Sequence, residues 1–308
     1  MGRRLRFKAA VLKRFREPFE IETVELEAPE GWVWVRVKAV GVCGRDRVVW
    51  LGGFRNLKPP LILGHEVFGE LDGKPVGVYP ALLGDPPRIL GEDLPGGYAE
   101  YVAIPQENIV GIPDERYEAY ASAVCGVATF IHASRLAGVG PGSKVLVTGA
   151  SGGVGIHGIQ YLLSKDVKVY AYTRRPEAAE KLRALGAEPV SSLDFYRAHG
   201  RVDVVFELVG AATFNQSMRA VKPGGVVMLI GNVGGEPITI ERPALLVMRE
   251  ICVKGSAAFY EREYREAVKL VGEGAIKPFY KTYKLDEVNN AYTDIQKGRV
   301  LGRAVLTP

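Results

Sequence analysis

The sequence is poor in cysteine, and its few cysteines lie far apart. Its 308 residues include only Cys43, Cys125 and Cys252. A secreted scaffold held by disulfides would have an even number of closely spaced cysteines, so this pattern predicts reduced thiols or metal ligands. The basic residues within positions 3–8 are followed by neither the apolar core nor the small-residue cleavage site of a signal peptide. We therefore expect a cytoplasmic protein.

Long apolar runs and long basic runs are also absent. The most apolar stretch, 119–131, is interrupted by Ser122, Gly126 and Thr129, and it is shorter than the roughly 18 residues that a membrane-spanning helix needs. Lys and Arg number 40 against 35 Asp and Glu, a net charge of +5 without a long basic segment. These features predict no membrane and no nucleic-acid partner, which leaves a small molecule as the expected substrate.

The composition, 47% hydrophobic and 24% charged residues, is that of an ordinary globular protein. At roughly 100–200 residues per domain, a chain of this length predicts two domains. Up to about residue 117, short apolar stretches are separated by Pro and Gly, which predicts a β-rich module. Its expected strands are 21–26, 33–40, 61–63, 66–71 and 98–104.

After residue 118 the pattern changes to buried strands alternating with helices, which predicts a parallel sheet. The expected strands are 144–147, 167–172, 203–207, 225–230 and 251–255, with helices that include 177–185 and 213–220. The last segment, with expected helices 261–273 and 285–297 and a strand 303–306, is predicted to return to the first module. The predicted domains are therefore 1–117 with 257–308, and 118–256.

A glycine-rich turn lies between the expected strand 144–147 and the helix after it. Its residues are Gly149, Ser151, Gly152, Gly153, Val154 and Gly155. In this context backbone amides and a helix N-terminus can face a pyrophosphate: Gly152 lets the phosphates approach the backbone, and Gly155 allows close contact of helix and strand. Ala150 departs from the usual G-x-G-x-x-G pattern at its first glycine. The alternative is a tight turn that binds no ligand.

The next strand ends near Tyr172 and is followed by Thr173, Arg174 and Arg175. An NAD-binding protein has an Asp or Glu at this place, which binds the ribose hydroxyls. Here no carboxylate is present, and two arginines can form charge-assisted hydrogen bonds with a ribose 2′-phosphate. The segment therefore predicts NADP(H) as the cofactor. The alternative is a solvated basic start of a helix.

Three further segments follow one another along the chain. They read GVCGRD at 41–46, LGHE at 63–66 and AVCGVAT at 123–129. In this order, ahead of a dinucleotide-binding turn, they resemble the zinc-containing medium-chain dehydrogenase/reductase superfamily, which includes alcohol dehydrogenases and quinone and enoyl reductases. The resemblance covers nearly the whole chain. It implies an α/β fold with a GroES-like β-rich catalytic domain and a Rossmann domain built on a doubly wound parallel sheet.

The resemblance implies that Cys43, His65 and Cys125 bind one catalytic Zn²⁺. A mixed set of thiolates and imidazole with one open position suits zinc. Glu66 would bind the metal when substrate is absent or stand just behind the ligands, and Asp46 would orient the ligand histidine. Considered alone, Cys43 or Cys125 would be a buried small hydrophobe, the commonest fate of a free cysteine.

The resemblance also places further residues at the cofactor. Those expected beside the nicotinamide ring are Thr129, Leu208, Val209, Gly210, Gly231, Asn232 and Val233. Arg303 is expected to reach the pyrophosphate from the last segment of the chain. The alternatives are that these are ordinary turn residues and that Arg303 is a surface cation.

Two departures from the family pattern affect the expected chemistry. Many relatives have four closely spaced cysteines for a structural zinc, whereas residues 67–95 contain none, so no structural zinc is predicted. Arg45 stands where alcohol dehydrogenases usually have the Ser or Thr that passes a proton, which a permanently protonated arginine cannot do. We expect Arg45 to be turned away, paired with Glu66 or Asp46, or used to hold an anionic group of the substrate. Cys252 matches no motif and is expected in the core.

The leading hypothesis is NADP(H)-dependent interconversion of a ketone or aldehyde with its alcohol, in which zinc polarises the carbonyl. The candidate catalytic residues are Glu66, Asp46 and Arg45. One alternative is reduction of an activated C=C bond in a quinone, an enone or an enoyl-CoA, because residues 146–157 are similar to the quinone and enoyl reductase branch, which includes acryloyl-CoA reductases. Another is a non-catalytic NADPH-binding protein. We expect a homodimer or a homotetramer.

Overall fold

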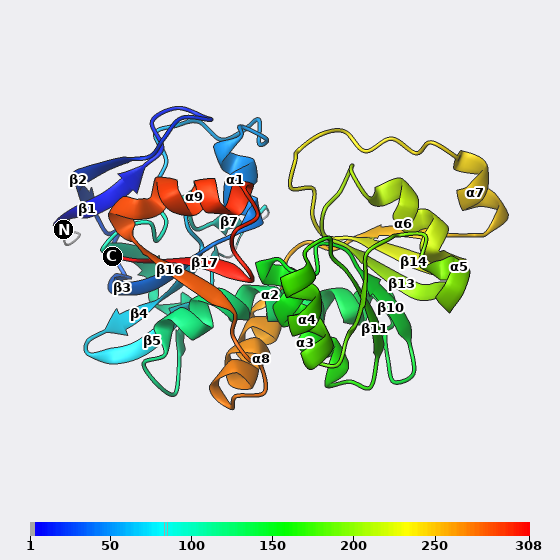
Figure 1. The fold of residues 1–308 in the computed structure, drawn as a ribbon. Helices are drawn as coiled ribbons and strands as arrows, with labels where there is room; N and C mark the ends of the chain where they lie inside the picture. The colour runs from blue at the N-terminus through cyan, green and yellow to red at the C-terminus, as the bar shows by residue number, and fades with distance from the viewer. Residues whose placement is uncertain (1–3, 83, 85) are drawn as a thin grey trace. The chain divides into compact units, whose positions relative to one another are not determined.

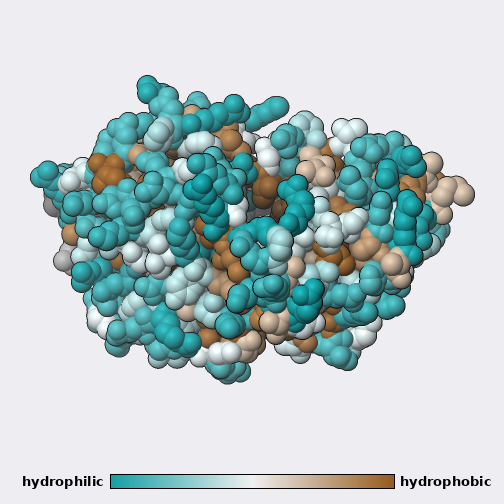
Figure 2. All heavy atoms as spheres, in the orientation of Figure 1, coloured by the Kyte–Doolittle hydropathy of each residue, from teal (hydrophilic) through white to brown (hydrophobic). Residues whose placement is uncertain are grey.

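The computed structural model describes residues 4–82, 84 and 86–308, and the chain forms two compact units (Figure 1). Unit 1 comprises Met1–Val124 and Val268–Pro308, and unit 2 comprises Cys125–Ala267. No helix of the described residues is long and apolar enough to cross a membrane. On the face shown in Figure 2, hydrophilic side chains predominate and hydrophobic ones form scattered patches.

Unit 1 is built on a seven-stranded sheet. Its strands lie in the order β16, β17, β3, β4, β5, β9, and β8 also pairs with β3. Their bounds are β3 Trp32–Val42, β4 Glu66–Leu71, β5 Lys74–Val78, β8 Tyr101–Pro105, β9 Ile109–Gly111, β16 Tyr280–Lys284 and β17 Arg303–Thr307. β3 is rich in valine, whose branched side chain favours strands, and Val35, Val37 and Val40 pack into one core with Leu63 and Tyr98. The first module is thus β-rich, and the last strands of the chain join its sheet.

Smaller elements complete unit 1. They are the antiparallel pair β1 Arg4–Val11 and β2 Glu20–Glu27, the short pair β6 Ala81–Leu82 and β7 Arg88–Ile89, α1 Gly44–Trp50, the 3₁₀ turns η1 Gln106–Asn108 and η2 Leu285–Glu287, and α9 Val288–Gln296. The expected strand 61–63 is wrong, since only Leu61 forms an isolated bridge, to Leu12. The carbonyls of Ile62 and Leu63 instead accept hydrogen bonds from an irregular glycine-rich segment, at Gly96 and Tyr98.

Unit 2 contains a six-stranded sheet in which every pairing is parallel. Its order is β12, β11, β10, β13, β14, β15. The bounds are β10 Lys144–Val147, β11 Lys168–Tyr172, β12 Glu188–Val190, β13 Val202–Glu207, β14 Val221–Leu229 and β15 Cys252–Gly255. Counted from β10, this is the order 3-2-1-4-5-6 of a Rossmann fold, in which a ligand binds at the carboxyl ends of the strands where the order reverses, here between β10 and β13. The predicted doubly wound sheet is confirmed.

Helices connect these strands. They are α3 Gly153–Leu163, α4 Pro176–Ala184, α5 Tyr196–His199, α6 Phe214–Ala220 and α7 Pro243–Met248. The expectation that Cys252 is a core cysteine is wrong, because its side chain is exposed. β15 is the last strand in the sheet order, so its apolar sequence does not place it in the interior.

The first boundary between the units lies between residues 124 and 125, and the sequence predicts it between 117 and 118. The second lies between residues 267 and 268, and the sequence predicts it between 256 and 257. Both divisions fall inside helices, α2 Tyr117–Ala137 and α8 Glu261–Gly272. The first turns of α2 pack in unit 1, where Tyr120 stacks on Phe68, whereas Phe130 further along packs on Phe206 of unit 2. A change in sequence pattern marks where the helix begins, but the packing partner changes within it.

Candidate active site

Four side chains that can bind a metal lie close together. The donor atoms of Cys43, His65, Glu66 and Cys125 are all within 4.8 Å of one another. The first three side chains are buried, and Cys125 is half-buried. The set predicted from the sequence as metal ligands is therefore brought together.

The pairing of β3 with β4 explains this convergence. The strands are antiparallel with Gly41 opposite Glu66, so the residues that follow β3 lie beside those that precede β4. Gly41 is required here because an added Cβ would overlap the Glu66 carboxylate and the Ala121 carbonyl. Ala121 belongs to α2, and Cys125 lies about one helical turn further along that helix.

Asp46 contacts both of the unit 1 ligand segments. It lies in the first turn of α1 and is 1% exposed. Its Oδ2 accepts hydrogen bonds from the Cys43 N–H at 2.9 Å and from the Tyr98 hydroxyl at 3.1 Å. Its Oδ1 is 3.1 Å from Nδ1 of His65. A hydrogen on Nδ1 would be donated to Asp46, which leaves Nε2 of His65 available to a metal.

The electrostatics of this cluster favour a cation. Burial would lower the pKa of His65, but the negative charges of Asp46 and Cys43 outweigh it and raise that pKa well above its ordinary value. Burial, with the charge of Asp46 added, raises the pKa of Tyr98 well above its ordinary value, so Tyr98 keeps its hydrogen and donates it. A cluster of buried acidic groups around one imidazole matches the donor set of a metal site.

Arg303 lies at this cluster. Its guanidinium is 2.9 Å from the carboxylate of Glu66, and both side chains are almost fully buried. The pairing of β17 with β3 brings it there, because Ala304 lies opposite Val42. The expected contact of Arg303 with a pyrophosphate stays a prediction, but Arg303 is not a surface cation.

Arg45 is paired with Glu92, not with Glu66 or Asp46. Nε and Nη2 of Arg45 contact the two oxygens of Glu92, the second at 2.9 Å. The guanidinium also lies over the Phe54 ring, 4.9 Å from its centroid. Burial lowers the pKa of Arg45, but Glu92 outweighs it and raises that pKa, so the cation is held. Glu92 is not predictable as this partner from the sequence, because an isolated acid 47 residues away from Arg45 has no periodic signal.

Glycines place Glu92 beside the ligand segment. An added Cβ on Gly91 would be 2.8 Å from the backbone nitrogen of Gly64, and one on Gly96 would overlap the carbonyls of Leu63 and Gly64. Such close approach of two backbones is possible only without side chains. The segment that carries Glu92 therefore lies directly against the residues before His65.

In unit 2 the glycine-rich turn has the form expected of a phosphate site. α3 begins at Gly153 with Gly152 as its N-cap, so the first N–H groups of the helix face the turn. An added Cβ on Gly155 would overlap the Gly149 carbonyl, so packing requires this glycine. An added Cβ on Gly152 would meet only the Gly149 oxygen, at 3.4 Å. The fold thus leaves space at Gly152 that a pyrophosphate would fill.

The two arginines after β11 differ in their surroundings. Arg174 is exposed and has no ion-pair partner among residues 4–82, 84 and 86–308. Arg175 is half-buried, pairs with Glu177 at 2.9 Å, and its N–H donates to the hydroxyl of Thr173. Arg174 is therefore the more available of the two to an anionic ligand.

The ends of β13 and β14 lie against each other. The Val233 N–H donates to the Val209 carbonyl at 3.1 Å, and an added Cβ on Gly210 would overlap the Asn232 side chain. Asn232 donates its amide to the Glu236 carbonyl, while its buried Oδ1 accepts no hydrogen bond from the described residues. That oxygen is a buried acceptor next to Gly210. The remaining residues expected at the nicotinamide, Leu208 and Gly231, belong to the same two strand ends.

Thr129 lies on α2, one turn after Cys125. Its hydroxyl donates to the Cys125 carbonyl at 2.8 Å, and its side chain is buried. Its expected place beside the nicotinamide stays a prediction.

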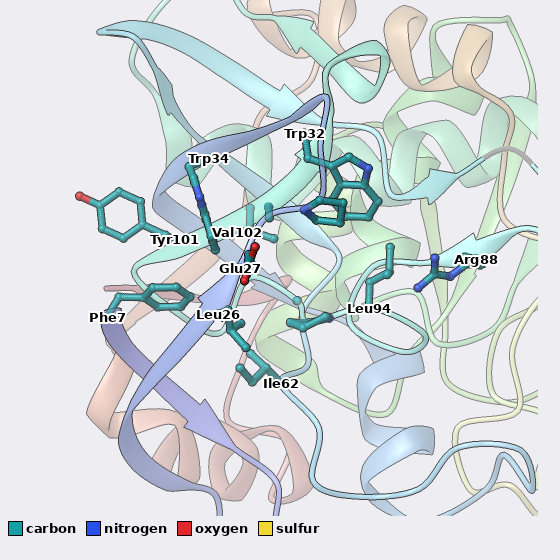
Figure 3. A pocket seen from close by; sticks show the side chains of 14 residues that line it. Phe7, Leu26, Glu27, Trp32, Trp34, Ile62, Arg88, Leu94, Tyr101 and Val102 are labelled. Atoms are coloured by element: carbon teal, nitrogen blue, oxygen red, sulfur yellow. The ribbon is translucent and has the colours of Figure 1, made fainter. Parts of the chain in front are cut away.

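A separate cavity of about 180 Å³ lies within unit 1 (Figure 3). Aromatic rings of Phe7, Trp32, Trp34 and Tyr101 form much of its lining. No residue expected at the metal or the cofactor lines it, so it is not part of the candidate site.

Known protein families and relatives match this chain along nearly its whole length. Residues 29–114 match the alcohol dehydrogenase GroES-like domain, and residues 153–273 match the zinc-binding dehydrogenase model. An NAD-dependent alcohol dehydrogenase of Sulfolobus acidocaldarius is 30% identical over 352 residues, covering 97% of this chain and 99% of that protein. An acryloyl-coenzyme A reductase of Metallosphaera sedula is 28% identical over 332 residues, covering 97% and 99%.

A solved structure shows the same fold. The thermostable alcohol dehydrogenase of Pyrobaculum aerophilum, with cobalt and zinc bound, has a TM-score of 0.88 and 28% identity, and the match covers 99% of this chain and 100% of that one. These relatives are dehydrogenases and reductases, which makes this protein an enzyme and sets aside the non-catalytic alternative. The chain therefore belongs to the zinc-binding dehydrogenases, the alcohol dehydrogenase-like members of the medium-chain dehydrogenase/reductase superfamily.

Proposed function

We propose that this enzyme interconverts a ketone or aldehyde with its alcohol, and that it depends on one zinc ion per chain and on NADP(H). The observation that carries the proposal is the cluster of Cys43, His65, Glu66 and Cys125, with donor atoms within 4.8 Å. Two thiols, an imidazole and a carboxylate are a donor set that zinc prefers, and three ligands leave a position for substrate.

Cys43, His65 and Cys125 would hold the metal. Asp46 would keep Nδ1 of His65 protonated, because the two groups are 3.1 Å apart and Asp46 is fixed by two further hydrogen bonds. Arg303, 2.9 Å from Glu66, would hold that carboxylate close behind the three ligands. A bound zinc ion supplies Lewis acidity for a carbonyl oxygen, and NADPH supplies the hydride.

The cofactor would lie along the carboxyl ends of the unit 2 strands. The turn 149–155 would bind the pyrophosphate through N–H groups, in the space left at Gly152. Arg174, exposed and not ion-paired with any described residue, would bind the 2′-phosphate together with Arg175. Asn232, whose buried Oδ1 has no donor in the described structure, would accept a hydrogen bond at the nicotinamide end.

The proposal is tested by metal analysis of protein purified without added zinc, combined with NADPH and NADH oxidation against ketones and aldehydes. We expect about one zinc per chain and carbonyl reduction that prefers NADPH. Cys43→Ser should lose metal and activity, whereas Cys252→Ser, at an exposed thiol outside the cluster, should keep both. Full carbonyl reductase activity in a metal-free preparation would overturn the zinc dependence, and a preference for NADH would overturn the choice of cofactor.

A second candidate function is reduction of an activated C=C bond. The observation that favours it is Arg45, which stands where a hydroxyl would pass a proton to or from an alcohol and cannot do so. The likeness to an acryloyl-coenzyme A reductase points the same way. Because Glu92 compensates the charge of Arg45, holding an anionic substrate is not the role we assign to that residue. Turnover of enones, quinones or enoyl thioesters, without turnover of ketones, would establish this function instead.

We also propose that the enzyme is a homodimer or a homotetramer. Val247 and Met248 of α7 are 70% and 82% exposed, and β15, the last strand in the sheet order, leaves Val253 partly exposed. Apolar side chains next to a sheet edge favour association of a second chain. Light scattering after size-exclusion chromatography tests this, with Met248→Glu expected to weaken assembly. A monomeric wild type would contradict the proposal.

A further inference from the structure

Glu207, the last residue of β13, is fully buried and accepts five hydrogen bonds. The donors to Oε1 are Thr148 Oγ1 at 2.7 Å, Val209 N at 2.9 Å, Gly210 N at 3.0 Å and Thr213 Oγ1 at 2.6 Å, and the donor to Oε2 is Ser217 Oγ at 2.5 Å. No Lys, Arg or His of the described residues forms an ion pair with it. Hydrogen bonds alone therefore compensate its burial.

Such a site matches a carboxylate. An ionised carboxylate only accepts hydrogen bonds, and each of the five partners is an N–H or O–H group. Leaving a buried polar group unmatched is costly, so all five partners are constrained to face Glu207. The hydroxyl of Thr148 links two residues, because it donates its hydrogen to Glu207 and accepts one from the Leu208 N–H at 2.9 Å.

Two partners of Glu207, Thr213 and Ser217, belong to the N-cap and body of α6, and the others lie at three strand ends. Thr148 directly precedes Gly149, the first residue of the glycine-rich turn. Val209 and Gly210 follow β13. The backbone carbonyl of Glu207 additionally accepts the N–H groups of Ile230 and Gly231 at 3.0 and 3.1 Å, at the end of β14. One residue thus joins the three strand ends that the proposed cofactor site uses.

These strand ends have few side chains of their own to hold them. Gly149 and Gly210 have positive φ angles, +61° and +97°, which glycine adopts without strain but which also leave its backbone freer in the absence of fixed partners. The Glu207 carboxylate supplies those partners at Gly210 directly and at Gly149 through Thr148. Its carboxylate bonds to backbone N–H groups of Val209 and Gly210 and to hydroxyl groups, so we place it behind residues of the cofactor site and not in contact with the cofactor itself.

We propose that Glu207 is a positioning residue of the dinucleotide site, which fixes the backbone that receives the pyrophosphate and the nicotinamide. The inference rests on the proposed cofactor site of unit 2. Weakening the network should therefore reduce the free energy of binding of the whole dinucleotide more than it reduces the free energy of unfolding. It should leave the 2′-phosphate end, at Arg174 and Arg175, nearly unchanged.

The test compares Glu207→Gln with the wild type and with Glu188→Gln. Glu188 is a matched control because it is a partly exposed carboxylate at the first residue of β12, away from the carboxyl ends of the strands. We expect Glu207→Gln to raise the Kd of NADPH by about tenfold, the effect of losing one hydrogen bond to a charged group. The Kd of 2′-AMP, which lacks the pyrophosphate and nicotinamide, should change by less than about twofold. Zinc content should equal that of the wild type.

Thr148→Val and Thr148→Ser provide an independent pair of variants if Glu207→Gln does not fold. Valine removes the hydroxyl that links Glu207 to the turn, and serine restores it. We expect weaker NADPH binding in the valine variant and near-normal binding in the serine variant. Amide hydrogen exchange at Val209 and Gly210 should be faster in Glu207→Gln without cofactor.

Two failures are distinguishable. A wild type that binds neither NADPH nor NADH contradicts the proposed function itself. A wild type that binds NADPH, together with folded Glu207 and Thr148 variants that bind it equally well, overturns only the positioning role. If the Glu207 and Thr148 variants lose NADPH binding and 2′-AMP binding equally, unit 2 is destabilised in general. This result would also overturn the positioning role of Glu207.

Discussion

The guanidinium of Arg45 and the carboxylate of Glu92 face each other with two contacts, 47 residues apart in sequence. Arg45 lies in α1, two residues after Cys43, and the segment of Glu92 packs on Gly64, next to His65. The pair therefore connects the two segments of unit 1 that carry candidate metal ligands. It also neutralises a cation that would otherwise repel a metal ion.

Removing Glu92 should weaken both the fold and the metal site. In Glu92→Gln the charge of Arg45 is left unbalanced beside the cluster. We expect the free energy of unfolding of the metal-free protein to fall by about 1–2 kcal/mol, since Arg45 is partly exposed, and zinc to be released faster to a chelator. Glu17→Gln, at the exposed pair with Arg14, should change neither. Unchanged zinc release would contradict a role of the pair at the metal site.

Asp46→Asn tests the group that orients His65. An amide at this position loses the charge-assisted contact with Nδ1 and places a donor where an acceptor is needed. We expect zinc affinity to fall by about 10- to 100-fold, measured by competition with a chromophoric chelator. Asp114→Asn removes another carboxylate of unit 1, one bonded to Arg116, and should leave zinc affinity unchanged. Equal affinities in wild type and Asp46→Asn would refute the orienting role.

Arg174 should decide between NADPH and NADH. In Arg174→Ala the 2′-phosphate loses a charged partner, so we expect the KM for NADPH to rise by about tenfold or more while the KM for NADH stays the same. Arg183→Ala removes an exposed arginine of the same βα segment, in α4, and serves as the control. A parallel rise in both KM values would mean that Arg174 does not contact the 2′-phosphate.

Substitution of Gly152 and of Gly155 by alanine should have different effects on stability and on NADPH affinity. An added Cβ on Gly155 overlaps the Gly149 carbonyl, so Gly155→Ala should lower the free energy of unfolding by about 1–3 kcal/mol. Gly152 has room for a Cβ, and its φ of −80° suits alanine, so Gly152→Ala should keep its stability. Its NADPH affinity should nevertheless fall, because the methyl group occupies the space of the pyrophosphate. Calorimetric unfolding and NADPH titration separate the two effects, and normal NADPH binding by Gly152→Ala would exclude this turn as the phosphate site.

The lowered pKa of Asp294 should account for part of the pH dependence of the melting temperature. Hydrogen bonds from Lys281 and Tyr283 lower its pKa to about 2, from about 3.9 in an unfolded chain. Because the folded pKa is the lower one, this stabilisation is present above about pH 4 and is lost as the pH falls toward 2. The melting temperature of Asp294→Asn should therefore decline less between pH 4 and pH 2 than that of the wild type, and Lys281→Met should flatten the curve similarly. Parallel curves for all three proteins would contradict this assignment.

Features that depend on neighbouring residues could be predicted from the sequence. The apolar strand, glycine turn and helix of residues 144–163 follow one another directly, so the pattern that forms the Rossmann turn is local. The three segments with candidate metal ligands were recognisable because each is a short motif in a known order. The convergence of those segments, however, depends on Gly41 pairing opposite Glu66, which is a matter of strand register.

The sequence by itself determined most of the elements, the parallel sheet of unit 2 and the candidate ligand types, since periodicity and motifs are properties of adjacent residues. Only the tertiary structure decided that Arg45 pairs with Glu92, that Glu207 joins three strand ends, and that Cys252 is exposed on the last strand of a sheet. The physical reason is common to these cases. Packing between segments far apart in the chain determines which charged side chains pair and which face of a strand is covered. A local sequence pattern does not contain this information.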